Sequence, residues 1–482
     1  MPAVPNGAVA AYKASLASRY IFSDEQGNLH IDWESYMTSC ANNPASTAQQ
    51  AAKRSRQRGP VPEYEICPFY QLYVTDTKHM MRNDSPLFRY RFRLPTKAYY
   101  ELLQDVKDEI RIKSEYFKRW QHAPLSQPEI PLELLVLGAL RMLGSNTTLD
   151  QISEVTYISK DTMNAFFREF CRWGSEVFYK RHVRAPSTRE ELDEIVKVYT
   201  LGGFAGCCGS IDATHVKLLN YIQADYNLLK GKENYPSLAF MVAVTHTGRV
   251  MHVGKAFYGA LNDKTMAGND AFIDRLRRDE LFTNYPFKLI DQQGKWHQYH
   301  GAYLLSDGGI LNERCFMPPL SITTQPDEIE WLKQHNGLRK DVECYFGRAK
   351  RRFRMLWYGI RFRDYGLVEM CFRFVCALMN WLHDIDGLGD DCSAFNIYKE
   401  EINQDLVNVE PPEVDEEEEK KANEPEPDDP QGPPASNDLD VRMEAAAAKT
   451  MYGFRKKLIA HYAVGRAEGW VGWPKRRRPY EF

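Results

Sequence analysis

The sequence predicts an α/β fold, a mixed sheet flanked by helices, preceded by an α-helical region. Three β-rich runs follow one another between Gly203 and Phe257, and a helical segment and the short apolar run Ala302–Leu305 come next. Two further helices close this region. The order β-β-β-α-β followed by helices is a layered α/β architecture. A hydrophobic content of 43% in 482 residues is enough to bury a sizeable core.

The N-terminal helices are predicted from apolar residues at helical spacing. Such spacing occurs from Pro95 to Val106 and from Pro131 to Leu143, and Gly144 is expected to end the second helix. Leu149–Thr156 and Lys160–Cys171 form a further pair around a break at residues 157–159, with Ser159 as the N-cap of the second member. The pair has the lengths and the turn of a helix-turn-helix motif.

The outward side chains of the second helix in this pair are candidates for DNA contact. Lys160, Asn164 and Arg168 lie opposite the apolar face, and these residue types bind phosphates or base edges. A helix pair inside a plain bundle is the alternative interpretation.

The elements of the α/β region are expected where apolar runs alternate with polar or glycine turns. Strands are predicted in Ile211–Leu219, Leu238–Val244 and Val250–Phe257. Helices are predicted in Met266–Leu281, Arg339–Leu356 and Leu367–Leu382.

Composition divides the chain into five segments. They are a mostly flexible region at 1–62, the helical domain at 63–200, the α/β domain at 201–386, a disordered acidic linker at 387–440, and a helical and basic tail at 441–482 with a helix expected at Val441–Ala460. The formal net charge is only −3, but residues 410–430 hold eleven carboxylates and two lysines, whereas residues 339–363 hold nine cations and two acids. Strong local fields of opposite sign are therefore expected.

Cysteine usage and hydropathy indicate an intracellular protein. The ten cysteines include no CxxC pair, and the longest apolar stretches are too short and too charged to span a bilayer. The start of the chain has no secretory signal pattern. The basic cluster Lys475–Arg478 is expected to act in nuclear import or phosphate binding, with a merely solubilising tail as the alternative.

Three carboxylates stand out by position. Asp212 lies on the first strand, Asp307 follows a later strand, and Glu343 lies on a helix. If the two strands are neighbours in one sheet, their backbones lie about 4.8 Å apart and the two aspartates can share cations. An all-oxygen cluster suits Mg²⁺, with Mn²⁺ as a substitute, and two such ions about 3.5–4 Å apart can activate a nucleophile and stabilise the leaving oxygen of a phosphodiester. The alternative is a chance triple among 65 acidic residues.

The helix that bears Glu343 also carries cations. Val342, Phe346 and Ala349 begin a buried stripe, and Glu343, Lys350 and Arg354 belong to the adjacent stripe. This places cations along the same side of the helix as the carboxylate, where they could neutralise DNA phosphates. The candidate DNA-binding residues on this helix are Arg348, Lys350, Arg351 and Arg354. A solvated basic face is the alternative.

Three segments resemble the catalytic blocks of PIF/Harbinger-type DDE transposases: Gly209–Val216, Leu304–Gly309 and Arg339–Phe353. The resemblance covers roughly residues 132–386. It implies a ribonuclease-H-like catalytic fold, a two-metal site formed by Asp212, Asp307 and Glu343, and DNA cleavage with strand transfer. Ala213 replaces the usual glycine, Ser306-Asp307-Gly308-Gly309 replaces Gly-Asp-Ser-Gly, and Asn262-Asp263 replaces a His-Asp pair, which makes Asp263 a second-tier candidate.

The sequence therefore predicts a nuclear, Mg²⁺-dependent transposase or transposase-derived endonuclease. The expected partners are double-stranded DNA, a second copy of the chain, because two DNA ends are processed together, and a Myb-like DNA-binding protein implied by the resemblance. The alternative is a host protein that keeps the fold as a non-catalytic DNA-binding or protein-interaction scaffold.

Overall fold

The computed structural model of the chain describes residues 63–75, 86–122, 130–387 and 439–472, together with two short strands near the N-terminus. Those strands, β1 (Ile21–Ser23) and β2 (Leu29–Ile31), pair antiparallel. The chain divides into two compact units, Met1–Val61 and Pro62–Phe482. Everything below concerns the second unit.

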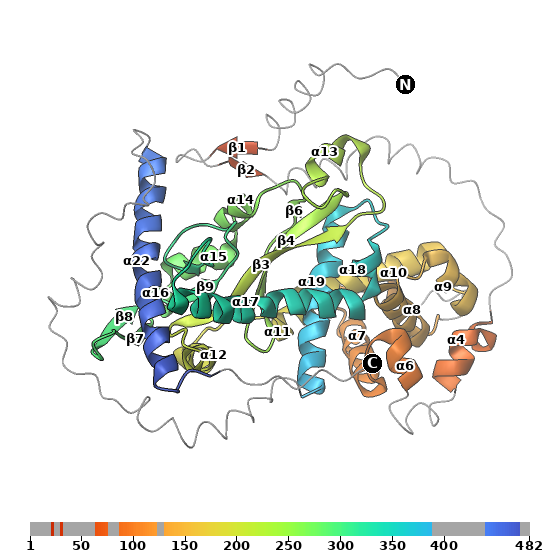
Figure 1. Ribbon diagram of the computed structural model, residues 1–482. Helices are drawn as coiled ribbons and strands as arrows, with labels where there is room; N and C mark the ends of the chain where they lie inside the picture. Colours follow the sequence, from red (N-terminus) through yellow and green to blue (C-terminus); the bar gives the residue numbers. More distant parts are fainter. Residues whose placement is uncertain are drawn as a thin grey trace, which may run out of the picture. The chain divides into compact units, whose positions relative to one another are not determined.

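A mixed sheet forms the centre of this unit (Figure 1). Its strand order is β10-β9-β3-β4-β5, and β6 pairs with the end of β4. The strands β4 and β5 run antiparallel to their neighbours, whereas β3, β9 and β10 are parallel to one another. The prediction that the strands leading to Asp212 and Asp307 are neighbours is confirmed. The bounds are β3 Cys207–Lys217, β4 Ser237–Val244, β5 Val250–Val253, β6 Phe257–Tyr258, β9 Tyr303–Leu305 and β10 Phe316–Met317.

Helices cover both faces of the sheet, so β4 is buried along its whole length. Phe240 and Val242 face one core, which they share with α17 (Pro326–Arg352) and α19 (Tyr365–Ile385). Met241 and Ala243 face a second core, which includes α12 (Arg189–Leu201) and α15 (Ala271–Arg278). The near-continuous apolar run of β4 is what burial on both faces requires.

The N-terminal helices belong to the first of these cores and do not form a separate body. Phe170 packs edge-on against Phe374 of α19 with ring centroids 5.0 Å apart, and Trp173 lies against the same ring. The predicted boundary at residues 200/201 therefore does not separate two compact domains. The bounds are η1 Tyr64–Ile66, α4 Pro68–Tyr70, η2 Gln71–Thr75, α6 Pro86–Phe92, α7 Thr96–Arg111, η3 Lys118–Trp120, α8 Leu132–Ser145, α9 Leu149–Thr156, α10 Lys160–Trp173, η4 Gly174–Phe178 and α11 Tyr179–His182.

Local capping explains where these helices begin and end. Thr148 and Gln151 form a capping box at the start of α9, and the Ser159 hydroxyl accepts a hydrogen bond from the Thr162 N–H at the start of α10. Ser159 is thus the N-cap that the sequence predicts. Gly144 does not end α8, because that helix continues to Ser145 and Asn146 takes the left-handed conformation at its C-cap.

The segment predicted as one helix at residues 266–281 is three short helices. They are α14 (Asp263–Gly268), α15 (Ala271–Arg278) and α16 (Glu280–Thr283). The break arises because Asp270 accepts hydrogen bonds from two N–H groups at the start of α15, and Asp279 caps α16 in the same way. Apolar spacing alone could not reveal these side-chain caps.

The helix with Glu343 is longer than the predicted 339–356. Pro326 occupies the first turn of α17, where a missing N–H costs nothing, and the chain bends at Phe353 before α18 (Arg354–Tyr358). The remaining short helices are η5 (Gln223–Asp225) and α13 (Tyr226–Leu229). In Figure 1, α17 lies across the sheet in front of β3.

The C-terminal helix α22 (Leu439–Ala467) is part of the folded core, not a tail. It buries Phe454, Leu458 and Tyr462 against the second core and contacts α17, β10 and the hairpin of β7 (Pro286–Ile290) and β8 (Trp296–His300). This hairpin was not predicted from the sequence, although Phe287 and Leu289 are buried on either side of Lys288. Figure 1 shows α22 and the hairpin at one end of the sheet and α6–α10 at the other.

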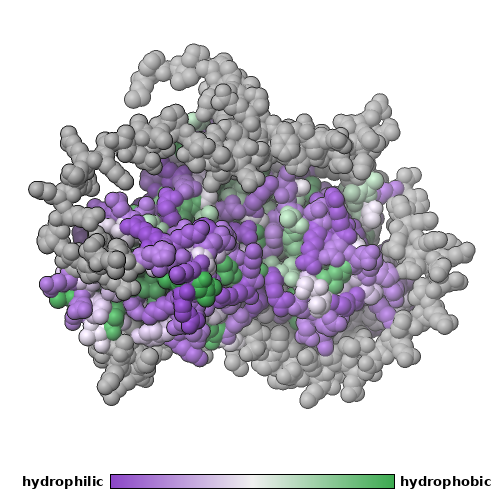
Figure 2. Space-filling model, turned by 180° about the vertical axis from the view of Figure 1, so that it is seen from behind, coloured by the Kyte–Doolittle hydropathy of each residue, from purple (hydrophilic) through white to green (hydrophobic). Residues whose placement is uncertain are grey.

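One described helix, α19, is long and apolar enough to cross a membrane by length and composition. It lies mostly buried between the sheet and α10 and forms the centre of the first core. The surface in Figure 2 is mainly hydrophilic, with small separated hydrophobic spots. The predicted acidic linker beyond Gly387, the basic cluster Lys475–Arg478 and almost all of residues 1–62 lie outside the described residues.

Candidate active site

Sheet register brings Asp212 and Asp307 to the same place. Ser210 of β3 lies opposite Leu305 of β9, and each aspartate stands two residues beyond that pair on its own segment. Because the two strands are parallel and adjacent, the two aspartates stand at matching positions, Asp212 within β3 and Asp307 two residues beyond the end of β9. Two residues 95 positions apart are thus neighbours only through strand pairing.

Asp212 is largely desolvated. Its side chain is 22% exposed, and its Oδ1 accepts a hydrogen bond of 2.8 Å from the Ala213 N–H. Burial raises the pKa of Asp212 from 3.8 to about 6, the Ala213 N–H and the Arg339 guanidinium oppose the rise, and the charges of Asp307 and Asp263 add to it. A buried carboxylate beside other carboxylates is a site that favours a bound cation.

Asp263, the second-tier candidate, joins this group. It lies at the start of α14, where the Asn262 side chain is the N-cap. A methyl group placed on Gly309 would lie 3.5 Å from Oδ2 of Asp263 and 3.8 Å from Oδ2 of Asp307, so both oxygens border the same small space. Lys232 also reaches Asp263, with Nζ 3.4 Å from Oδ2. No local motif pointed to Lys232.

Glu343 approaches the aspartates through an arginine. One turn earlier on α17, Arg339 places Nη2 at 2.8 Å from Oε1 of Glu343 and Nη1 at 3.9 Å from Oδ2 of Asp212. The arginine is only 16% exposed, whereas Glu343 is 44% exposed. The guanidinium therefore links two of the three carboxylates that the sequence assigns to metal binding. The i, i+4 spacing to Glu343 was the signal that could have identified it.

The donor chemistry of the site fits a hard cation. Asp212, Asp307 and Asp263 supply only oxygen donors, and the desolvation of Asp212 disfavours its charge until a cation is near. Among the residues that the structure describes, however, no three His, Cys, Asp or Glu side chains are gathered as a metal-binding group. Arg339 instead supplies the positive charge between Asp212 and Glu343.

The predicted DNA-binding residues of α17 and α18 differ in their surroundings. Arg348 is not a free surface cation, because its Nη2 donates to the carbonyl oxygens of Thr247 and Gly248 and supports that turn. Lys350 is half-buried, and this burial lowers its pKa. Arg351 is exposed. Arg354 stacks over the ring of Tyr90, with Cζ 5.8 Å from the ring centroid.

The predicted contacts of α10 are partly occupied by protein partners. Lys160 forms an ion pair with Asp150 of α9. Arg168 donates to Asp364 at 2.6 Å and lies over the ring of Phe362, so it connects α10 to the start of α19. Asn164 is half-buried. The helix pair forms as predicted, but its two cations already have acidic partners within the fold.

Aromatic and histidine residues near the site also find their places. Trp357 and Tyr358 of α18 are 56% and 53% exposed, whereas Phe353 is buried. His215 is buried on β3 and hydrogen-bonded through Nδ1 to the Ser237 hydroxyl at 3.0 Å.

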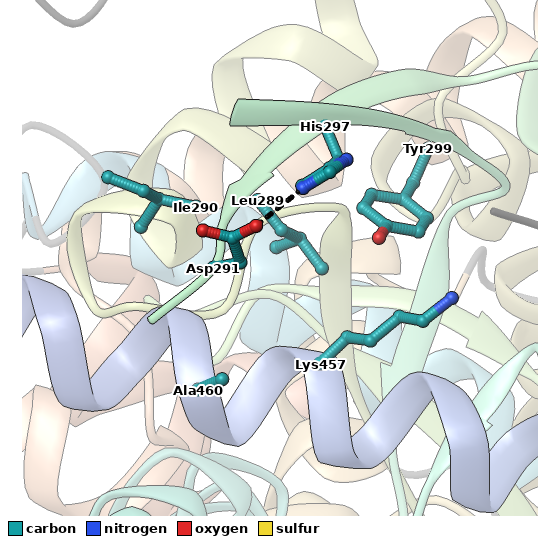
Figure 3. A pocket seen from close by; sticks show the side chains of 7 residues that line it. All are labelled: Leu289, Ile290, Asp291, His297, Tyr299, Lys457 and Ala460. Atoms are coloured by element: carbon teal, nitrogen blue, oxygen red, sulfur yellow. Dashed lines mark hydrogen bonds and ion pairs between the residues drawn. The ribbon is translucent and has the colours of Figure 1, made fainter. Parts of the chain in front are cut away.

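A small pocket lies away from the carboxylates, between the β7–β8 hairpin and α22 (Figure 3). Its lining is mainly apolar. Asp291 and His297 contact each other directly in its lining, with Oδ2 and Nε2 2.8 Å apart, and Nζ of Lys457 lies 5.3 Å from the ring centroid of Tyr299. None of the candidate catalytic acids lines this pocket.

The comparisons with known proteins agree with this arrangement. The family described as DDE superfamily endonuclease matches residues 211–380, which contain the three catalytic candidates and Asp263. The chain is also 24% identical over 311 residues to "Protein ALP1-like" of Arabidopsis thaliana, a match that covers 63% of this chain and 72% of the plant protein. No solved structure matches the chain.

Residues 211–380 thus match a DDE-superfamily endonuclease domain, and this segment contains Asp212, Asp307 and the helix with Glu343. Together with the plant relative, this match supports a PIF/Harbinger-type, transposase-derived family, the one that the three motifs resemble.

Proposed function

We propose that the protein is an endonuclease that cuts and joins DNA phosphodiesters with divalent metal ions, Mg²⁺ or Mn²⁺, on a ribonuclease-H-like core. The observation that carries the proposal is that Asp212, within β3, and Asp307, two residues beyond β9, stand at matching positions on adjacent parallel strands, beside the helix that bears Glu343. Two metal ions, when bound, would activate the attacking oxygen and stabilise the departing one.

The chain's own residues have distinct parts in this proposal. Asp212 and Asp307 would hold the cations, and Glu343 would complete the set from the helix side after releasing Arg339. Asp263, which borders the same space as Asp307, would contribute a further carboxylate at the edge. Once its ion pairs with Asp212 and Glu343 are broken, Arg339 would remain beside the carboxylates and could bind a phosphate oxygen of the DNA, for which its planar guanidinium is suited.

Further parts of the proposal follow from the substrate. The expected DNA contacts remain Lys350, Arg351 and Arg354, with a helix-turn-helix role for α9 and α10, whereas Arg348 supports the Thr247–Gly248 turn. We propose a nuclear location, a homodimer that holds two DNA ends, and a Myb-like partner. These parts rest on the resemblance and on the DNA substrate.

A cleavage assay on end-labelled duplex DNA tests the activity. The full chain with Mn²⁺ or Mg²⁺ is expected to cut, and Asp212→Asn or Glu343→Gln is expected to lower the rate by at least about a hundredfold, which corresponds to about 2.7 kcal/mol of transition-state stabilisation. The control is Asp327→Asn, an exposed acid in the first turn of the same helix, which should cut like the unchanged chain. Cutting that survives either catalytic substitution excludes the assignment.

One observation favours a second function, a scaffold that binds DNA without cutting it. Arg339 already supplies one positive charge between Asp212 and Glu343, which a metal ion would otherwise provide. If the chain binds duplex DNA with metal-independent affinity and shows no metal-induced stabilisation, the scaffold function is the correct one.

A further inference from the structure

Four cationic or aromatic side chains on three separate elements meet at the surface next to the end of α17. We name Tyr90, Arg93, Arg141 and Arg354 the arginine–tyrosine patch. Tyr90 belongs to α6, Arg93 follows that helix, Arg141 lies on α8, and Arg354 begins α18. Tyr90 is 58% exposed, and the Cζ atoms of Arg93 and Arg354 lie 4.9 and 5.8 Å from its ring centroid.

Backbone contacts fix the arginines of this patch. Arg93 has the left-handed backbone conformation, with φ 69°, and its Nε donates to the Gly144 carbonyl at 3.0 Å. Arg141 donates through Nη1 to the carbonyl of Arg91 and to the hydroxyl of Ser145, both at 3.1 Å. A left-handed conformation is costly for a residue with a side chain, so the position of Arg93 is held by its surroundings.

The patch has no acidic counterpart. Within the described part of the chain, no carboxylate forms an ion pair with Arg93, Arg141 or Arg354, whereas the neighbouring Arg89 and Arg352 share Asp386 at 2.5 and 3.3 Å. Burial, and then the charges of Arg354 and other neighbouring arginines, lower the pKa values of Arg93 and Arg141. Like charges held this close destabilise the fold until an anion binds between them.

The surface continues onto the exposed aromatics of α18. Trp357 and Tyr358 lie three and four residues after Arg354, which places all three on one face of the helix. Glu343 lies nine residues before the end of α17 at Arg352, a rise of about 14 Å at 1.5 Å per residue, and Arg354 begins α18 just beyond the bend at Phe353. This length corresponds to about four to five nucleotides at 3.4 Å each.

We propose that the arginine–tyrosine patch binds the phosphate backbone of DNA about four to five nucleotides from the phosphodiester held at the carboxylates. This inference rests on the proposed DNA substrate. Guanidinium groups bind phosphates in a planar, bidentate manner and lose little entropy when they are already fixed. The exposed rings of Tyr90 and Trp357 offer apolar contacts to sugars or unpaired bases beside the phosphates.

Binding of labelled duplex DNA by the full chain in EDTA, followed by fluorescence anisotropy at several salt concentrations, tests the proposal. The double variant Arg141→Gln/Arg354→Gln is expected to lose about tenfold in affinity and to reduce the slope of log affinity against log salt by about 1.8, since each phosphate contact contributes about 0.9. The matched control Arg184→Gln/Arg278→Gln removes two exposed arginines elsewhere and should change affinity less than about twofold.

Two further arms keep the outcomes distinct. Arg354→Lys keeps the charge and should retain the salt slope, which excludes a folding defect as the cause of the loss. Unchanged affinity and slope in the double variant would overturn the proposal. The proposal would also be overturned if the double variant lost binding to a peptide of residues 410–430, which holds eleven carboxylates, while its affinity for DNA stayed unchanged. Because the binding assay contains no metal, its result is independent of cleavage. A wild-type chain that binds DNA through the patch in EDTA but does not cut in the separate cleavage assay with Mn²⁺ refutes the nuclease function alone.

Discussion

Asp212→Asn is expected to stabilise the folded protein when no divalent metal is present. Burial raises the pKa of Asp212 from 3.8 to about 6. At neutral pH the carboxylate is ionised in both states, and the ionised form is less stable in the folded state than in the unfolded state. At 1.36 kcal/mol per pKa unit this difference destabilises the fold by about 3 kcal/mol. Asparagine keeps the shape and can still accept the Ala213 N–H, but loses the attraction to Arg339. A net gain of about 1–3 kcal/mol is therefore expected.

The pH dependence has a definite sign. A carboxyl whose folded pKa is raised binds more protons in the folded state between pH 3.8 and about 6, so the unchanged chain loses stability as pH rises through this window. The asparagine variant lacks this contribution, and the two proteins should differ little below pH 4 and most above pH 6. Urea unfolding in EDTA measures the difference, with the exposed Glu101→Gln on α7 as the control.

Metal completes the test. Millimolar Mn²⁺ should stabilise the unchanged chain by about 1–3 kcal/mol, an amount set by the ratio of the Mn²⁺ concentration to its dissociation constant. The stability of Asp212→Asn should not change with Mn²⁺. If the variant is less stable than the unchanged chain at pH 7.5 in EDTA, or gains equally from Mn²⁺, then Asp212 is an ordinary hydrogen-bonded carboxylate and the reasoning fails.

Three further predictions concern other parts of the fold. Arg339→Gln should lower the free energy of unfolding in EDTA by about 1–3 kcal/mol. The variant should nevertheless bind Mn²⁺ more tightly, because no guanidinium competes for the carboxylates. Weaker Mn²⁺ binding, measured from the unfolding free energy at increasing Mn²⁺ concentrations, would contradict this. His461 accepts a hydrogen bond from the Ile290 N–H through Nδ1, and burial lowers the pKa of His461 to about 4. The free energy of unfolding of the unchanged chain should therefore fall by about 3 kcal/mol as the pH falls from 6.5 through 4. In urea titrations, His461→Gln should largely remove this pH dependence. Gly174→Ala would place a methyl carbon 2.3 Å from the ring of Phe374 and should cost about 1–3 kcal/mol in thermal unfolding, whereas Gly337→Ala in α17, with open space around it, should be neutral or stabilising.

The predicted elements agree with the structure where one local signal dominates. Leu238–Val244 is a continuous apolar run, and it forms β4 with one extra residue. The turn at residues 157–159 and the Ser159 cap were readable because both depend on neighbours within three residues. The single helix expected at residues 266–281 is wrong, since the Asp270 and Asp279 side chains interrupt it by capping.

Long-range packing explains the larger differences. The helix α22 has an apolar side that is meaningful only against the β7–β8 hairpin and α17, and nothing within residues 441–482 indicates that surface. The helices of residues 63–200 and the α/β region share one core because Phe170 and Trp173 find their partner, Phe374, two hundred residues later. Composition suggested a boundary that the packing does not have.

Local signals in the chain predicted the strands that bear Asp212 and precede Asp307, the three acidic candidates and the family resemblance, because β propensity, helical periodicity and short motifs are local properties. Packing in three dimensions was needed to show that Arg339 joins Asp212 to Glu343, that Asp263 borders the same space as Asp307, and that Arg348 supports a turn. It also decided that Arg93, Arg141 and Arg354 gather around one tyrosine. Distances between side chains from separate elements depend on how those elements pack, and no spacing along the chain encodes them.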